Sequence, residues 1–102
     1  MAREQLQTLT EPMYYILLAL TQQCCGVDIM GKVKTLSHGR VSVGPGTLYA
    51  MLPKFVDMGL IRPTDYHSRR KSYIITDAGL QELKKEYTRL QTMVADGREL
   101  IG

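Results

Sequence analysis

The sequence contains no tryptophan, a single phenylalanine and no apolar run that approaches the ~20 residues a helix needs to cross a bilayer. Its first residues include Arg3 and Glu4 before a polar stretch, whereas a secretion signal needs an apolar core. We therefore expect a protein of the cytoplasm with no membrane partner. At 102 residues we expect one small domain with a modest core, which burial of surface in a dimer would help to stabilise.

Cysteine and histidine are also scarce, with two residues of each. Cys24 and Cys25 are adjacent, and their Cα atoms would lie ~3.8 Å apart, too close for an easy disulfide between them. We expect both thiols to be reduced, one in the core and the other less buried. His38 and His67 lie far apart and have no cluster of metal-ligating or catalytic residues around them. No metal, cofactor or enzymatic activity is therefore predicted.

The charge is unevenly placed, although the net charge is only +3. Residues 28–76 contain eight basic and three acidic residues, a net charge of +5, whereas the two flanks together carry −2. A basic middle between near-neutral ends is the electrostatic layout of a DNA-binding domain. Many solvated faces look similar, so this pattern indicates a nucleic-acid partner only in combination with other features.

The stretch 44–59 predicts a short helix. Pro45 suits the first helical position, where its missing N–H costs nothing, and Gly59 suits the end of a helix. Pro53 lies inside this helix, where a proline removes one backbone hydrogen bond at a cost of ~3 kcal/mol or more. Because the apolar pattern continues past Pro53, we expect a kink near residues 49–52 and not a stop.

Apolar residues recur in this stretch at three- and four-residue spacing, so they share one buried face. Thr47, Tyr49 and Lys54 fall off that face and point outward. A hydroxyl, a phenol and an ammonium near the start and middle of a helix suit its insertion, N-terminus first, into a DNA major groove. The apolar face consists of Leu48, Met51, Leu52 and Phe55.

Two further helices precede this one. Thr10 can cap a helix that continues to about Gln23 and is apolar on two sides, which is typical of a helix with two packing partners. Gly26 breaks the chain, and a helix is expected over residues 27–36. A loop that ends in a short strand or a simple lead-in, over residues 37–43, then joins the two later helices into a helix-turn-helix.

Two short strands are expected after these helices, at residues 60–64 and 72–76, around the basic connection 65–71. Pro63 argues for an edge position or a strand end, because proline cannot donate a hydrogen bond to a neighbouring strand. A basic hairpin that follows a helix-turn-helix is a wing.

The last helix is expected to begin at Thr76 or Asp77 and to continue through Gly97. Its apolar residues repeat every three or four positions, a heptad-like seam that so small a domain cannot cover by itself. A second subunit is the simplest partner for this seam and for the second apolar side of the first helix. The residues expected at this dimer interface are Tyr14, Tyr15, Leu18, Leu83, Tyr87, Leu90 and Val94.

The run GPGTLY at residues 44–49, the triplet GLI at 59–61, the run RRKSY at 69–73 and Thr76 together resemble the PadR family of transcriptional regulators. The resemblance extends from about Leu9 to the last helix. The GTLY run and the basic run are fairly specific at this separation, whereas either alone would be a weak signal.

The resemblance implies a mainly α fold with a small β-hairpin, in which a winged helix-turn-helix repressor acts as a homodimer. Residues 1–76 would be the DNA-binding domain, and residues 77–102 would be a C-terminal dimerisation helix. The partner would be double-stranded DNA with a pseudo-palindromic operator. Pro53 departs from the family, many of whose members have a longer polar residue there.

Within this interpretation, Thr47 and Tyr49 contact phosphates and base edges. The structural alternative is that Tyr49 packs over the helix-turn-helix core, that Thr47 stabilises the first turn and that the basic hairpin is merely solvated. We favour DNA contact for the helix and for the hairpin. The candidate DNA-binding residues are Gly44, Gly46, Thr47, Tyr49, Lys54, Arg69, Arg70, Lys71, Lys34 and Arg40.

Two alternatives stay open. Some PadR-like proteins bind a flat aromatic effector at the dimer interface, which here would use a pocket formed by Tyr14, Leu18 and Tyr87; plain interface packing is the interpretation we favour. The chain could also be a winged-helix protein-interaction module without specific DNA binding. The basic block and the outward Thr47 and Tyr49 argue against that module.

Overall fold

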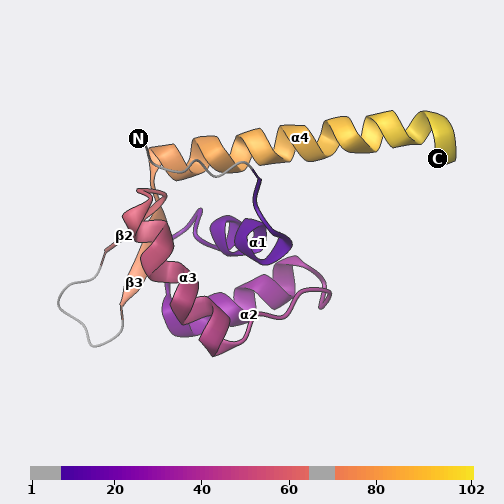
Figure 1. Ribbon diagram of the computed structural model, residues 1–102. Helices are drawn as coiled ribbons and strands as arrows, with labels where there is room; N and C mark the ends of the chain where they lie inside the picture. Colours follow the sequence, from indigo (N-terminus) through magenta and orange to yellow (C-terminus); the bar gives the residue numbers. More distant parts are fainter. Residues whose placement is uncertain (1–7, 65–70) are drawn as a thin grey trace.

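A computed structural model of the chain describes residues 8–64 and 71–102. The described residues form four helices and a three-stranded antiparallel sheet, so the predicted mainly α fold is confirmed. Helix α1 lies between the long helix α4 and the pair α2 and α3 (Figure 1). In chain order the elements are α1 (Glu11–Ala19), β1 (Cys24–Cys25), α2 (Gly26–Leu36), α3 (Pro45–Asp57), β2 (Ile61–Pro63), β3 (Ser72–Ile75) and α4 (Asp77–Ile101).

Helix α1 is shorter than the sequence predicted. Thr10 caps it as expected, since its hydroxyl oxygen accepts a hydrogen bond from the N–H of Met13 at 3.3 Å. The helix ends at Ala19, however, so the prediction that it continues to Gln23 is wrong. Just after the helix end, the carbonyl of Leu20 accepts the N–H of Ile75 in β3 at 2.8 Å, a bond that directs the chain toward the sheet.

The residues after that turn form a strand that the sequence did not predict. In β1, Cys24 lies opposite Tyr73 and Cys25 lies opposite Ser72, so β3 is the central strand in the order β1-β3-β2. Cys24 is buried and Cys25 is half-buried, and both are free thiols, as predicted. Strand β2 is an edge strand, which confirms the edge position predicted from Pro63.

Gly26 does not break the chain, as the sequence suggested, but is the first residue of α2. The turn that follows α2 is held by Ser37, whose hydroxyl accepts the N–H of Val41 at 2.9 Å and is buried. His38 and Gly39 both adopt positive φ in this turn, at 56° and 81°. Residues 41–43 are a lead-in and not a strand.

Helix α3 begins at Pro45 and continues through Pro53 without a stop, as predicted. Gly59 ends it in the left-handed conformation, with φ of 76°. The N–H of Leu60 donates to the carbonyl of Phe55 and the N–H of Gly59 to that of Val56, which is the hydrogen-bond pattern of a Schellman motif. The kink expected near residues 49–52 stays a prediction.

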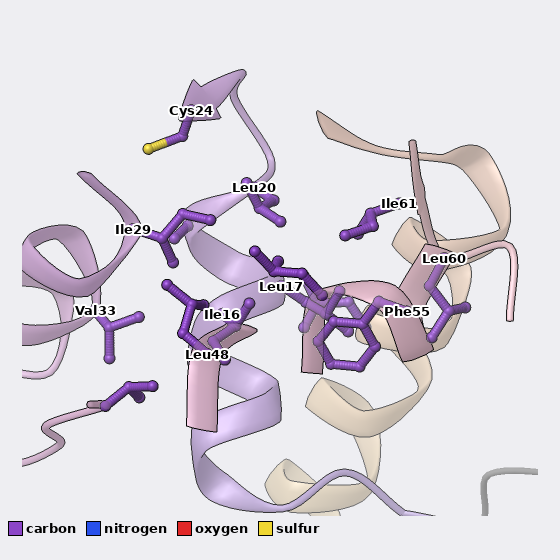
Figure 2. Close-up of a cluster of buried hydrophobic side chains, with 14 of the residues drawn as sticks. Ile16, Leu17, Leu20, Cys24, Ile29, Val33, Leu48, Phe55, Leu60 and Ile61 are labelled. Carbon is purple, nitrogen blue, oxygen red and sulfur yellow. The ribbon is translucent and has the colours of Figure 1, made fainter. Parts of the chain in front are cut away.

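The core gathers around α1, where buried side chains of α2, α3 and β2 meet it (Figure 2). Ile16 and Leu17 of α1 and Leu48 of α3 have no exposed surface, and Phe55 has 1%. Burial of side chains of this size contributes roughly 1.5–3 kcal/mol each. This packing fixes the orientation of α3. The apolar face predicted from the sequence is buried in the core, and the remaining face is left to solvent.

Helix α4 is anchored at its start and extends away from the domain at its end (Figure 1). The hydroxyl of Thr76 accepts the N–H of Gly79 at 3.0 Å and donates to the carbonyl of Gly59 at 2.6 Å. Leu83 and Glu86 are buried, whereas almost all residues after Leu90 are exposed. The cap at Thr76 and the start at Asp77 confirm the prediction for this helix.

Candidate nucleic-acid interface

The outward face of α3 is where the sequence placed it. Thr47, Tyr49 and Lys54 are exposed, and Tyr49 keeps 48% of its surface accessible. Because Leu48, Leu52 and Phe55 are buried on the opposite side, the rotation of the helix about its axis is fixed. The hydroxyl, phenol and ammonium groups are therefore presented to solvent on one element.

Gly44 caps α3, Gly46 lies in its first turn, and both are exposed. A Cβ atom built on either residue meets no heavy atom within 4 Å. Nothing among the described residues thus requires a glycine at these two positions. The open space over the first turn is compatible with close approach of another molecule to the backbone.

Tyr49 does more than point outward. Its ring lies along the first residue of α2, so that a Cβ atom on Gly26 would be 3.2 Å from the ring carbon Cε1 and 3.2 Å from the hydroxyl oxygen. Sequence reasoning missed this contact, because it joins two helices and no local pattern marks it. The phenol is therefore half-packed and half-exposed, between the two alternatives considered for it.

A hollow of about 410 Å³ opens beside Tyr49, between α3, the start of α2 and the base of the wing. Its walls include Tyr49 and Pro53 of α3, Val27 of α2, and Lys71 and Tyr73 at the wing base. Burial raises the pKa of Tyr73 above its usual value, and the neighbouring Tyr49 raises it further. Tyr73 is consequently a neutral phenol at physiological pH and can donate a hydrogen bond.

The wing base is connected directly to α2. The carbonyl of Lys71 accepts the N–H of Gly26 at 3.1 Å, and the Lys71 side chain is exposed. The predicted DNA contacts Arg69 and Arg70 lie outside the described residues. The structure thus brings together Tyr49 and Lys71, two of the predicted site residues, and adds Tyr73, which was missed although it belongs to the RRKSY run.

Arg40 and Lys34 are both exposed, but Arg40 is tied to α1. Its guanidinium forms an ion pair with Glu11 at 2.9 Å and donates to the hydroxyl of Tyr15 at 3.2 Å. An exposed ion pair of this kind contributes little to stability. Arg40 would have to exchange these partners for a phosphate in order to contact DNA. It is held at α1 and does not line the hollow that Tyr49 and Lys71 share.

The residues predicted at a dimer interface fall into two groups. Leu83 is already buried within its own chain, and Tyr14, Tyr15, Leu18 and Leu90 are half-buried. Tyr87 and Val94 remain 54% and 59% exposed. Tyr14 stacks edge-on against Tyr15, with ring centroids 5.7 Å apart.

The three residues of the predicted effector pocket come from two helices, since Tyr14 and Leu18 belong to α1 and Tyr87 to α4. The pKa of Tyr14 is raised chiefly by burial, and also by Tyr15, Tyr87 and Glu86 nearby. Tyr14 and Tyr87 therefore belong to two helices that pack against each other, and the charge of Tyr87 is close enough to influence Tyr14.

Other kinds of site find no support in the described ranges. Residues 8–64 and 71–102 contain no group of three or more histidine, cysteine, aspartate or glutamate side chains placed to hold a metal ion. No helix in the same residues is long and apolar enough to cross a membrane.

The arrangement of α2, turn and α3, followed by the β2–β3 hairpin and a long terminal helix, defines a winged helix-turn-helix protein. The sequence model of the transcriptional regulator PadR-like family matches residues 16–85. The chain belongs to this family and is a transcriptional regulator. No curated protein matches it.

Solved structures share the fold. A PadR-like transcriptional regulator from Bacillus cereus has a TM-score of 0.71 at 24% identity, over 86% of this chain and 88% of that chain. A PadR-like transcription factor from Bacteroides fragilis has a TM-score of 0.71 at 24% identity, over 88% and 91%. A winged-helix DNA-binding protein from STIV has a TM-score of 0.69 at 15% identity, over 85% and 96%.

Proposed function

We propose that this chain is a cytoplasmic, dimeric repressor, without enzymatic activity, that binds a pseudo-palindromic site in double-stranded DNA. The observation that carries the proposal is the outward face of α3, where Thr47 and Tyr49 are exposed and Tyr49 lies beside the exposed Lys71 of the wing base. Hydroxyl groups and lysines are the side chains that commonly contact phosphate oxygens. Thr47 and Tyr49 place or read the bases, and the basic wing supplies most of the affinity.

The dimer is proposed from the far half of α4. Exposed apolar side chains recur from the middle of α4 onward, including Tyr87, Met93 and Val94. The end of α4 extends away from the other elements (Figure 1). An isolated helix segment of this length is marginal in water, so a second α4 packed against it would stabilise both. In this arrangement residues 77–102 are the dimerisation helix and residues 1–76 the DNA-binding domain. A two-fold dimer would place two α3 helices ~34 Å apart on one face of DNA.

The test is a selection of genomic fragments with the purified protein at near-physiological salt, followed by a gel shift on the enriched site. We expect a palindromic site whose affinity falls steeply with salt, because phosphate contacts release counterions. Tyr49→Ala and Arg70→Ala should each weaken binding to that site. If both variants bind as tightly as the wild type, the contact assignment is wrong.

The same selection separates a repressor from a protein-interaction module. Recovery of no site, with only salt-sensitive, sequence-independent binding, would favour the module. Sedimentation of the free protein, at the concentrations used in the gel shift, gives its mass and thus shows whether it is a dimer. A dimer with sequence-specific binding supports the proposal in both of its parts.

An aromatic effector is the second, finer candidate, favoured by the proximity of Tyr14 and Tyr87 across α1 and α4. Its binding would place a flat ring against Tyr14, Leu18 and Tyr87 at the dimer interface. Titration with planar aromatic compounds should then quench tyrosine emission and lower DNA affinity. Unchanged emission and unchanged affinity would leave these side chains as interface packing.

A further inference from the structure

Gly26 lies where a side chain would collide with a residue of the proposed DNA-binding face. It is the first residue of α2, its φ is outside the left-handed region, and its N–H donates to the carbonyl of Lys71 at 3.1 Å. The backbone at this position can therefore accept any L-residue. What requires a glycine here is space, not conformation.

The space at Gly26 is occupied by Tyr49. A Cβ atom at this position would lie 3.2 Å from both Cε1 and the hydroxyl oxygen of Tyr49, closer than an ordinary carbon contact. The phenol would have to move by a few tenths of an ångström or swing away. Gly31 in the same helix offers the opposite case, since a Cβ atom there meets nothing within 4 Å.

We propose that Gly26 is a positioning residue, which holds the phenol of Tyr49 at the rim of the hollow so that Tyr49, Tyr73 and Lys71 meet one stretch of DNA backbone together. This inference rests on the proposed DNA-binding function. The occupant of the hollow is the sugar–phosphate backbone of the operator, because two phenols and an ammonium are donors to phosphate oxygens and the hollow joins α3 to the wing.

The physical reason is pre-organisation. A phenol that rests against the backbone of α2 loses little rotational freedom when DNA binds, so more of the contact free energy appears as affinity. Hydrogen bonds from a phenol O–H to a phosphate are short and directional, so a displaced hydroxyl loses most of the contact. Gly26 never touches DNA in this account and acts only through Tyr49.

The experiment is a double-mutant cycle on the operator that the wild type selects. Affinities are measured by fluorescence anisotropy for Gly26→Ala, Tyr49→Ala and the double variant, with Gly31→Ala as the matched control. We expect Gly26→Ala to weaken binding about tenfold in the wild-type background, as loss of one charge-assisted hydrogen bond would. In the Tyr49→Ala background it should change affinity by less than about twofold, as should Gly31→Ala in the wild type.

Equal weakening by Gly26→Ala in both backgrounds would overturn the proposal, since the glycine would then act independently of Tyr49. No weakening in either background would overturn it as well. Thermal unfolding by circular dichroism accompanies each variant, and we expect Gly26→Ala to fold, because alanine is favourable in the first turn of a helix.

A measurement on the wild type keeps the two proposals distinguishable. Nuclear Overhauser effects between the Hα atoms of Gly26 and the ring of Tyr49 should be seen in the free protein. Their absence would overturn the positioning role without any variant or DNA. If they are present but the wild type selects no DNA site, the proposed function itself has failed and the positioning role with it.

Discussion

Gly79 of α4 is in direct backbone contact with Leu60, which lies in the turn that ends α3. A Cβ atom on Gly79 would lie 2.0 Å from the carbonyl oxygen of Leu60, a distance at which atoms overlap. That same carbonyl accepts the N–H of Thr76 at 2.9 Å. The start of α4 can therefore reach the end of α3 only because residue 79 has no side chain.

Gly79→Ala should destabilise the protein substantially, because the backbone atoms it meets cannot move aside as a flexible side chain would. We expect a loss of about 1–3 kcal/mol in the free energy of unfolding, measured by urea denaturation. Gly97→Ala is the matched control in the same helix, where a Cβ atom meets nothing within 4 Å. It should be neutral or stabilise by up to about 1 kcal/mol. Similar stabilities for the two variants would contradict the contact.

Gly46→Ala should separate stability from DNA affinity. Gly46 lies in the first turn of α3, is exposed and has open space around it, so alanine should stabilise the helix by about 0.5–1 kcal/mol. If the missing side chain serves close approach of DNA, affinity for the selected site should fall although Tm rises. Both quantities rising together would show that this glycine has no part in DNA contact.

Val94→Glu should dissociate the proposed dimer without disturbing the fold, because Val94 is 59% exposed within its own chain. Two carboxylates brought together at a two-fold interface repel and lose water, so the dissociation constant of the dimer should rise more than about a hundredfold. Sedimentation over a range of concentrations measures it. Thr92→Glu, on the opposite side of α4, is the control and should change dimerisation about twofold at most. A dimer that survives Val94→Glu would place the interface elsewhere.

Glu86 gives the protein a pH-dependent contribution to stability. Glu86 is buried on α4, and the Arg89 guanidinium donates from Nε to its carboxylate oxygen Oε1 at 3.1 Å. This hydrogen bond holds the pKa of Glu86 below the ordinary value of 4.5. Burial opposes the shift, and a backbone hydrogen bond from Leu9 supports it. A lowered pKa in the folded state means that the contribution is complete above the unfolded value and is lost as pH falls through the folded value.

The corresponding variant is Glu86→Gln. It should be less stable than the wild type at neutral pH, because Arg89 loses its partner, and its stability should fall less steeply as the pH is lowered below 4.5. Urea denaturation at a series of pH values measures both effects. Glu82→Gln, which removes a more exposed ion pair with Lys85, should change stability by less than about 1 kcal/mol. Parallel pH profiles for wild type and Glu86→Gln would refute the assignment.

The sequence was informative where local chemistry decides the structure. Pro45 and Gly59 mark the ends of α3, and the spacing of Leu48, Leu52 and Phe55 fixes its buried face. The same holds for Thr76 at the start of α4. In each case the deciding contacts lie within a few residues along the chain, where helix capping and periodicity operate.

What the sequence could not predict depends on contacts between distant residues. Cys24 and Cys25 form a strand only because Tyr73 and Ser72 pair with them, and a two-residue strand leaves no periodic pattern. The contact of Gly26 with Tyr49 and the ion pair of Arg40 with Glu11 likewise join separate elements. These long-range contacts decide which candidate side chains gather at the interface and which are held away from it.

Thr76 joins the end of α3 to the start of α4. Its hydroxyl donates to the carbonyl of Gly59, which ends α3, and accepts the N–H of Gly79 in the first turn of α4. In the proposed dimer, α4 is therefore a rigid helix about 37 Å long whose first turn is fixed to the end of α3, the proposed DNA-reading helix. A change in the crossing angle of the two α4 helices would be converted into a change in the spacing of the two α3 helices, and hence into a choice between operators of different half-site separation.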